Sequence, residues 1–304
     1  MRWAAIDVGS NTVRLLVADI VSPTHLCVLT DVSRMTRLGK GLARGAEPNS
    51  KALADTARAV RDFADQARDE GAERLFCAVT ASLRDRQGAE AGLAALNDAA
   101  GVEARTLSGD EEARLTFQGA LTALPDMPGT VGVMDLGGGS LEIAVGHRGE
   151  SPRAFWSFPI GARLGTEQFL RRLPPSEAGL AALRQRVVEV LADGAVAQLA
   201  RCDCVVGVGG TVTTLAELAF GVDGQAAGQG LTASEISIQV SAFSSLPLAE
   251  ARLRLPQDPE RAEVIVAGGV IVEELLRLAG TDKIIVSYGG IRHGLLLEAA
   301  RAGA

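Results

Sequence analysis

The sequence lacks the features that would assign it to several large classes of protein. No apolar run reaches membrane-spanning length, and Asp7 interrupts the apolar start that a secretion signal would need. Cys202 and Cys204 stand close together, but no second cysteine or histidine pair completes a zinc site. Neither a P-loop nor the dinucleotide-binding pattern G-x-G-x-x-G occurs. We therefore expect a cytoplasmic protein that has no membrane partner and no dinucleotide fold.

Lysine is scarce as well, and the net charge is −7. A field of this sign does not favour nucleic acid or any other polyanion, so a phosphate-rich ligand must be held by a local basic patch. The lysines are Lys40, Lys51 and Lys283, and arginine supplies the rest of the Lys and Arg content. Because arginine is the ordinary basic residue of this chain, only its position can identify a phosphate contact.

One motif occurs twice, beginning at Asp7 and again at Asp135. In each copy an apolar run ends in Asp-x-Gly, passes through small residues and returns as a second apolar run. This pattern predicts a strand, a turn and a strand. A single copy would be interpreted as an ordinary hairpin, but two such turns facing each other would form a phosphate-sized cleft lined by backbone N–H groups. The predicted phosphate-binding residues are Gly9, Ser10, Asn11, Thr12, Gly137, Gly138, Gly139 and Ser140.

Strands and helices follow in the same order in both halves of the chain. Apolar strands that alternate with helices predict an α/β protein with mostly parallel sheets covered by helices. Strands are predicted at 3–8, 12–20, 26–32, 75–79, 103–107, 131–136, 140–147, 152–158, 204–208 and 283–286. Helices are predicted at 50–70, 88–100, from Ser108, at 162–171, 176–200, after Thr211, and at 232–242, 247–253, 259–279 and 290–301.

Two prolines and a glycine at 124–129 mark the boundary between two domains. We expect residues 1–124, together with about 290–304, to form the N-terminal domain, and residues 125–289 to form the C-terminal domain.

Glu112 is the candidate for proton transfer. Ser108 and Glu111 have the spacing of a capping box, which gives Glu111 a structural task at the start of a helix. Glu112 is not needed for the cap. The helix dipole would keep its carboxylate ionised and able to accept a proton from water. From this segment alone, two acids that merely favour the helix dipole are an open alternative.

Taken together, five motifs resemble the exopolyphosphatase / guanosine pentaphosphate phosphohydrolase family, over nearly the whole chain. The resemblance implies two duplicated ribonuclease-H-like domains around a cleft, the fold of actin, sugar kinases and heat-shock ATPases, in the short two-domain form. The motifs are Asp7-Val-Gly-Ser-Asn-Thr12, Thr80-Ala-Ser-Leu-Arg-Asp85, Ser108-Gly-Asp-Glu-Glu-Ala-Arg114, Asp135-Leu-Gly-Gly-Gly-Ser-Leu-Glu142 and Gly207-Val-Gly-Gly-Thr211.

The resemblance also implies roles for individual residues. Glu112 matches the catalytic base, Arg84 matches a motif arginine suited to bidentate phosphate contact, and Asp135 and Glu142 match positions linked to metal and catalysis. Asp7, Asp135 and Glu142 are the predicted ligands of Mg²⁺, with Mn²⁺ or a monovalent cation as alternatives. Two further predicted substrate contacts are a helix N-terminus and a basic loop: Gly209, Gly210, Thr211, and Arg34, Arg37, Lys40. For each basic residue of the loop, an ordinary solvated position is an open alternative.

We expect an Mg²⁺-dependent exopolyphosphatase that releases orthophosphate from inorganic polyphosphate, with a homodimer as the family expectation. The nearest alternative is hydrolysis of the 5′-γ-phosphate of guanosine pentaphosphate. A small-molecule kinase of the same fold and a phosphate-ligand sensor without turnover are the alternatives from other classes.

Overall fold

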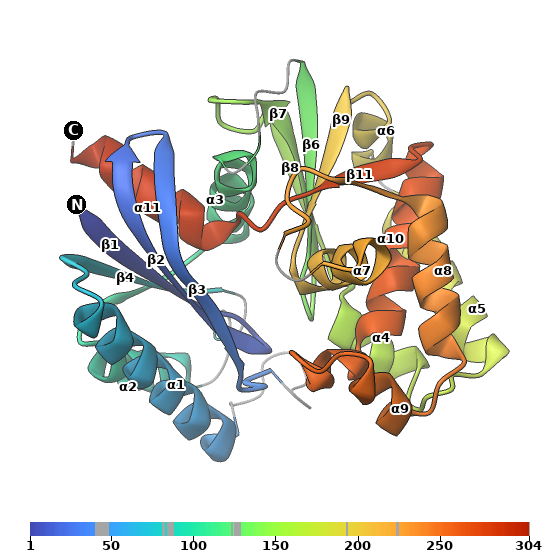
Figure 1. The fold of residues 1–304 in the computed structure, drawn as a ribbon, viewed down its shortest axis with the longest axis horizontal. Coiled ribbons are helices and arrows are strands. Elements are labelled where there is room, and N and C mark those ends of the chain that lie inside the picture. Colours follow the sequence, from blue (N-terminus) through green and yellow to red (C-terminus); the bar gives the residue numbers. More distant parts are fainter. Residues whose placement is uncertain are drawn as a thin grey trace. The chain divides into compact units, whose positions relative to one another are not determined.

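The computed structural model describes residues 1–39, 49–80, 83, 88–122, 124, 129–192, 194–222 and 225–303. It divides into two compact units (Figure 1). Unit 1 comprises Met1–Thr122 and Gly290–Ala304, and unit 2 comprises Ala123–Gly289. Unit 1 is therefore built from both ends of the chain, whereas unit 2 is one continuous segment.

The sheet of unit 1 has the strand order β3-β2-β1-β4-β5. Its strands are β1 (Arg2–Val8), β2 (Thr12–Ser22), β3 (His25–Met35), β4 (Arg74–Val79) and β5 (Ala104–Thr106). Strands β1, β2 and β3 pair antiparallel, whereas β1, β4 and β5 run parallel. The carboxyl ends of these three parallel strands meet at one edge of the sheet. The turn after β1 and the helix after β5 therefore both begin at that edge.

Helices cover both faces of this sheet (Figure 1). One face carries α1 (Ser50–Asp69) and α2 (Ala89–Ala100), and the other carries α3 (Gly109–Thr122) and α11 (Ile291–Ala302). Side chains alternate along β1: Ala4, Ile6 and Val8 join the core under α1 and α2, whereas Trp3 and Ala5 join the core under α3 and α11. Asp7 continues the second series, so it lies on the face that α3 and α11 cover.

The sheet of unit 2 contains the same arrangement. Its order is β10-β11-β9-β6-β7-β8, in which β8-β7-β6-β9-β11 repeats the order and directions of β3-β2-β1-β4-β5. Its strands are β6 (Thr130–Leu136), β7 (Leu141–His147), β8 (Ala154–Phe158), β9 (Cys204–Val208), β10 (Gly230–Thr232) and β11 (Lys283–Val286). The predicted α/β fold with a duplicated architecture is therefore confirmed.

An apolar helix, α10 (Ile265–Ala279), is the centre of the core of unit 2. It packs against five other α-helices and shares the core with Met134, Leu136 and Ile143 of the sheet. The remaining helices are α4 (Ala162–Phe169), α5 (Glu177–Val190), α6 (Ala195–Leu199), α7 (Gly210–Phe220), α8 (Ala233–Ser244), α9 (Leu248–Leu253) and the 3₁₀ helix η1 (Pro259–Glu263). Because side chains alternate along a strand, Asp135 and Glu142 lie on the opposite face of the sheet from this core.

Three predictions of secondary structure were wrong in detail. The single helix expected at 176–200 is divided into α5 and α6, with Leu191 as the C-cap of the first and Gly194 as the N-cap of the second, and glycine is a poor helix former. The helix expected at 259–279 begins as a 3₁₀ turn, and Val264, with φ −121°, separates η1 from α10. Strand β10 was not predicted, because three residues carry too little periodicity.

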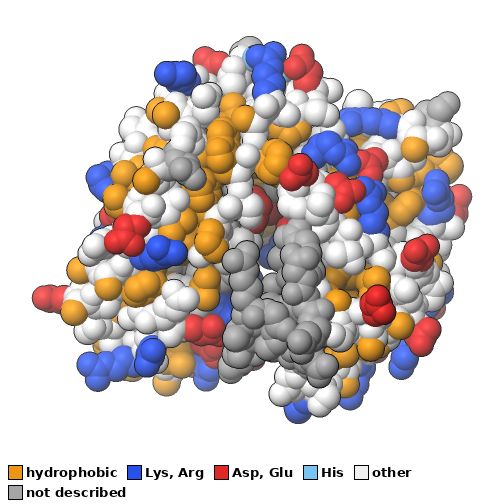
Figure 2. All heavy atoms as spheres, turned by 180° about the vertical axis from the view of Figure 1, so that it is seen from behind, with side chains coloured by type: hydrophobic (Ala, Val, Ile, Leu, Met, Phe, Trp, Pro, Cys, Tyr) orange, Lys and Arg blue, Asp and Glu red, His pale blue; other side chains and the backbone are white. Residues whose placement is uncertain are grey.

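Charged side chains of both signs are interspersed over the described part of the surface that Figure 2 shows. Within the described residues, every helix is too short or too polar to cross a membrane.

Candidate functional site

The two predicted phosphate-binding turns have the same local geometry. The N–H of Gly9 donates to the carbonyl of Thr12 at 3.0 Å, and the N–H of Gly137 donates to the carbonyl of Ser140 at 3.0 Å. A Cβ atom at Gly9 would lie 3.2 Å from the accepting oxygen, and one at Gly137 would lie 3.4 Å from it. Each turn therefore closes tightly on its glycine, and the duplication extends to individual hydrogen bonds.

Each turn is also held by the segment that follows the third strand of its sheet. In unit 1, the N–H groups of Thr36 and Arg37 donate to the carbonyl of Asn11, both at 2.9 Å. In unit 2, the N–H of Ala162 donates to the carbonyl of Gly137 at 3.0 Å. The carbonyl groups of Asn11 and Gly137 thus accept hydrogen bonds from other segments of the protein. Backbone N–H groups in such turns form the concavities that bind anions.

Asp7 is a buried carboxylate beside the first turn. It is 9% exposed, and its Oδ1 has no hydrogen-bond partner among the described residues. Arg14 lies directly opposite it on β2. Burial raises the pKa of Asp7, whereas the positive charges of Arg14 and Arg292 act to lower it. The free oxygen is available to a ligand, and two arginine charges act on the carboxyl group.

Asp135 and Glu142 form the corresponding pair in unit 2. They are directly opposite each other across β6 and β7, so both side chains lie on the same face of the sheet. The hydroxyl of Ser157 donates to Oε1 of Glu142 at 2.9 Å. Two opposed carboxylates can hold a cation. Among the described residues, however, no cluster of three or more His, Cys, Asp or Glu side chains completes a metal site.

The predicted helix N-terminus at Gly209 lies against Asp135. Gly209 has φ +94°, and a Cβ atom there would lie 3.0 Å from Oδ1 of Asp135. Residues with side chains rarely adopt this backbone conformation, so glycine is required. Gly210 begins α7 beside the guanidinium group of Arg261, and Thr211 is buried against Gly268. The three predicted residues therefore lie at the carboxyl end of β9, next to the end of β6.

The predicted capping box at the start of α3 is present. The N–H of Glu111 donates to the hydroxyl of Ser108 at 3.2 Å, and the carboxylate of Glu111 accepts from the N–H of Ser108 at 2.9 Å. The hydrogen bond from Arg105 and those from Ser108 lower the pKa of Glu111 to about 2. Glu111 therefore has the structural task that the sequence predicts.

Glu112 takes no part in that cap through its side chain. Its backbone N–H donates to the carbonyl of Ser108 at 2.9 Å, and its side chain is only 6% exposed. Helix α3 begins at the same sheet edge as the Gly9 turn and covers the face on which Asp7 lies. A buried carboxylate is thus placed at the sheet edge where the Gly9 turn lies.

Helix α11 fixes the position of α3. A Cβ atom at Gly119 would overlap the carbonyl of Gly290, and one at Gly294 would overlap the carbonyl of Leu115, so the two helices are in backbone contact. Glu298 of α11 accepts from Arg105 at 2.9 Å and also pairs with Arg114. These contacts were not predicted from the sequence, although glycines within helical patterns are a signal of close packing.

The residues of the predicted basic loop lie in different surroundings in the structure. Arg34 pairs with Asp62 of α1, and its guanidinium carbon lies 5.2 Å from the centre of the Phe63 ring. Arg37 lies beside the Gly9 turn and has a left-handed backbone with φ +57°, which is uncommon for a residue other than glycine. Lys40 and Arg84 lie outside the described residues.

Two arginines that the sequence analysis missed lie at the glycine turns of unit 2. Arg163, in the first turn of α4, is close to Gly139, and Arg261, in η1, is close to Gly210. Arginine is so common in this chain that neither position stood out in the sequence as a candidate phosphate contact. Only the return of α4 and η1 to the carboxyl edge of the sheet identifies them.

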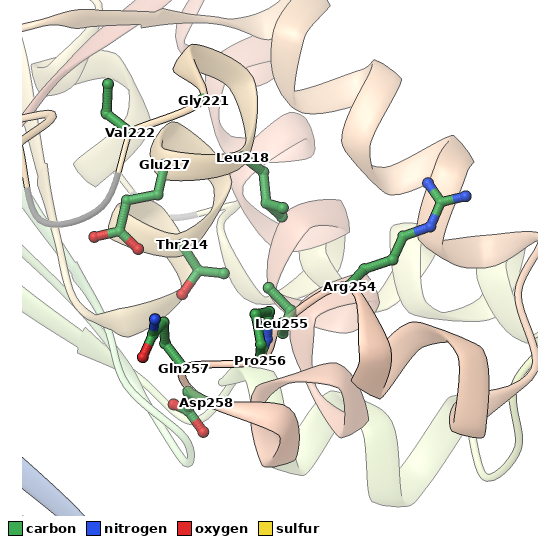
Figure 3. A pocket seen from close by; sticks show the side chains of 10 residues that line it. All are labelled: Thr214, Glu217, Leu218, Gly221, Val222, Arg254, Leu255, Pro256, Gln257 and Asp258. Atoms are coloured by element: carbon green, nitrogen blue, oxygen red, sulfur yellow. The ribbon is translucent and has the colours of Figure 1, made fainter.

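A pocket of about 310 Å³ lies in unit 2 along α7 (Figure 3). Thr214, Glu217 and Leu218 of α7 form one wall, and the segment 254–258 forms another. The side chain of Arg254 extends away from the pocket. Apolar and acidic side chains therefore dominate its lining, which does not suit a bare polyanion.

The chain is similar to known proteins over nearly its whole length. The model of the Ppx/GppA phosphatase family matches residues 16–302. The chain is 34% identical to exopolyphosphatase 2 of Mycobacterium tuberculosis, covering 98% of both proteins. It is 30% identical to exopolyphosphatase 1 of Mycobacterium bovis, covering 98% of this chain and 88% of that one. The crystal structure of the Ppx/GppA family member of Aquifex aeolicus superposes with a TM-score of 0.81 at 29% identity, covering 100% of this chain and 98% of that one.

Proposed function

Because the chain belongs to the Ppx/GppA phosphatase family, we propose that it hydrolyses the terminal phosphoanhydride bond of inorganic polyphosphate and releases orthophosphate. Relatives that cover almost the whole chain are named exopolyphosphatases. The observation that carries the proposal is the place of Glu112. It is a buried carboxylate, separate from the cap, at the sheet edge that also carries the Gly9 turn.

Glu112 is the general base in this proposal. Water attacks the terminal phosphorus, Glu112 accepts the proton of the water, and the shortened chain leaves with its bridging oxygen. Within each unit, backbone N–H groups of its glycine turn, at Gly9 or at Gly137, can bind phosphate oxygens. We also assign Arg37 to this group of contacts, because its backbone is held against the first turn. Arg84 and Lys40 stay predictions.

Asp135 and Glu142 are the residues that we propose to hold a divalent cation, most simply Mg²⁺. Mg²⁺ usually binds one or two carboxylates together with phosphate oxygens, and the opposed pair fits that requirement. The ion would offset the charge of the phosphoryl group. Asp7 stays a predicted ligand, but the charges of Arg14 and Arg292 oppose a cation there, so we prefer the pair in unit 2.

The test compares phosphate release from polyphosphate, guanosine pentaphosphate and ATP by the wild type and by Glu112→Gln, with and without Mg²⁺. Glu111→Gln and Asp110→Asn are matched controls, because both acids lie in the same helical turn. We expect only the Glu112 variant to lose turnover while keeping its fold. Absence of phosphate release from polyphosphate by the wild type would refute the proposal.

A second candidate function is hydrolysis of guanosine pentaphosphate, and the pocket along α7 favours it. The pocket offers apolar surface from Leu218, Leu255 and Pro256, together with polar groups of Thr214 and Gln257. These groups suit an uncharged nucleoside better than a chain of phosphates. Replacing Leu218 by Trp to fill the pocket should weaken hydrolysis of the nucleotide and leave polyphosphate hydrolysis unchanged. Absence of nucleotide hydrolysis by the wild type would remove this candidate, and an unchanged rate on the nucleotide in Leu218→Trp would remove the role of the pocket.

A cytoplasmic location and a homodimer stay predictions. Sedimentation of the purified chain over a range of concentrations tests the second of these.

A further inference from the structure

We propose that Arg163 is a phosphate-contacting residue of the Gly137–Ser140 turn. This inference rests on the proposed function and adds to it a cationic contact that was not identified from the sequence. The ligand group is the terminal phosphoryl group of the substrate or the orthophosphate that is released.

The backbone on both sides of Arg163 is hydrogen-bonded to the turn. The N–H of Ala162 donates to the carbonyl of Gly137 at 3.0 Å, and the N–H of Leu164 donates to the carbonyl of Gly138 at 2.9 Å. A Cβ atom at Gly161 would lie 2.6 Å from the carbonyl carbon of Gly138, so the chain approaches the turn as closely as it can. Arg163 therefore has little freedom to move away from the turn.

The guanidinium group of Arg163 lies beside Gly139. Its Nη2 is 3.7 Å from the point that a Cβ atom of residue 139 would occupy, so the missing side chain leaves this nitrogen open to a ligand in the turn. The side chain is only 15% exposed, and its Nη1 donates to Glu167 at 2.8 Å. This pair, one helical turn apart, holds the guanidinium group in one orientation.

The Nε atom of Arg163 is buried and has no hydrogen-bond partner among the described residues. A buried donor without an acceptor is costly, and a guanidinium group is built to donate two parallel hydrogen bonds to a phosphate. A phosphate oxygen bound in the turn would supply the missing acceptor. An arginine that served only to anchor α4 through Glu167 would not account for a buried Nε without an acceptor.

The corresponding segment of unit 1 also brings an arginine to its turn. It follows β3, as the segment of Arg163 follows β8, and it is bonded to the Gly9 turn through the N–H groups of Thr36 and Arg37. Both copies of the duplicated element thus combine a glycine turn with one arginine on the returning segment.

The experiment uses the full chain and three variants, Arg163→Gln, Arg163→Lys and Glu167→Gln. Steady-state hydrolysis of polyphosphate gives kcat and KM, and equilibrium dialysis measures binding of inorganic phosphate. For Arg163→Gln we expect a loss of about ten- to a hundredfold in kcat/KM and weaker phosphate binding, the size expected for one charged hydrogen-bond pair. Lys should recover part of this loss, and Glu167→Gln should stay within a few fold of the wild type.

Two outcomes would overturn the proposal. In one, Arg163→Gln keeps the phosphate affinity of the wild type. In the other, Glu167→Gln loses as much as Arg163→Gln, which is the result of a purely structural ion pair.

If Arg163→Gln does not fold, Gly139→Val replaces it. The new side chain would stand against Nη2 while the pair with Glu167 remains, and we expect the same loss of phosphate binding. Unchanged binding in Gly139→Val would then refute the contact. If the wild type hydrolyses no polyphosphate, the proposed function fails, whereas phosphate binding by these variants still decides the role of Arg163.

Discussion

Glu142 lies directly opposite Asp135 across β6 and β7, with both side chains on one face of the sheet. The same place in unit 1 is occupied by Arg14, opposite Asp7. The duplicated hairpins therefore differ in charge at equivalent positions. A pair of carboxylates suits a cation, whereas the positive charge of Arg14 beside Asp7 disfavours one. Two copies of one element have thus become chemically different.

Neutralising Glu142 should weaken the binding of the metal ion. For Glu142→Gln, we expect the Mg²⁺ concentration at half-maximal rate to rise about tenfold or more, because one of the two proposed carboxylate ligands is lost. Titration of the rate with Mg²⁺ and with Mn²⁺ measures this shift. Glu150→Gln, in the exposed turn after β7, is the control. An unchanged titration for Glu142→Gln would place the ion elsewhere.

Glu112→Gln should lower kcat by about 10²- to 10⁴-fold, the usual contribution of a general base. The amide keeps the shape of the side chain but cannot accept the proton. Stopped assays of phosphate release measure the rate, and circular dichroism checks that α3 is intact. A fall of the same size in Glu111→Gln, at equal stability, would contradict the assignment.

The cap at Glu111 predicts a dependence of stability on acid pH. Its pKa is about 2 in the folded chain and 4.5 when unperturbed, so its contribution is complete above pH 4.5 and is lost as the pH falls towards 2. The difference in unfolding free energy between the wild type and Glu111→Gln should therefore shrink as the pH falls from 5 to 3. Urea unfolding at each pH measures it. A constant difference would mean that packing, and not charge, is lost.

Gly119→Ala should destabilise the protein by about 1–3 kcal/mol or more, because its methyl group would overlap the carbonyl of Gly290 and force α3 and α11 apart. Gly290→Ala is a matched control: its methyl group would meet no atom within 4 Å, and its φ of −178° is open to any residue. Thermal unfolding compares the two. If both variants unfold at the same temperature as the wild type, the close approach of the helices is wrong.

His293 predicts a second dependence of stability on pH. Burial, followed by the charge of Arg292, lowers the pKa of its imidazole from 6.5 to about 4, while Asp31 acts in the opposite direction. As the pH falls below 6.5, His293 is therefore protonated in the unfolded chain while it is still neutral in the folded one. Stability should fall as the pH drops from 6.5 to 4, by an amount on the order of 2–3 kcal/mol from this group. His293→Leu should flatten the curve in urea unfolding. An equally steep curve in that variant would assign the loss to other groups.

The sequence predicted the strands, most helices and the duplication because these depend on local patterns. Apolar runs marked β1 and β6, and the spacing of Ser108 and Glu111 predicted a cap that is present. The failures have physical causes. Arg163 is identified as a candidate contact only in the structure, where α4 packs against the Gly137 turn, more than twenty positions earlier in the chain. The helix is divided near a single residue, Gly194, which the apolar periodicity of the segment does not mark.

The opposite charges at Arg14 and Glu142 could have been read from the duplicated motif, since each stands seven positions after its aspartate. The consequence of these charges became clear only from the strand pairing. Arg14 lies opposite Asp7, whereas Glu142 lies opposite Asp135. The three acids that the sequence predicts as metal ligands therefore lie in two different environments.

The return of the chain to unit 1 after residue 289 has a consequence for synthesis on the ribosome. Unit 2 is complete once its own continuous segment has emerged. The five strands of unit 1 are synthesised much earlier, but the sheet face that α11 covers stays exposed until the C-terminus is made. Asp31 and Arg105 likewise have no Arg292 and Glu298 to pair with until then. Throughout translation of unit 2, the nascent N-terminal half would expose Trp3, Leu16 and Leu115 to chaperones. The order of synthesis thus makes the later half of the protein the first to finish folding.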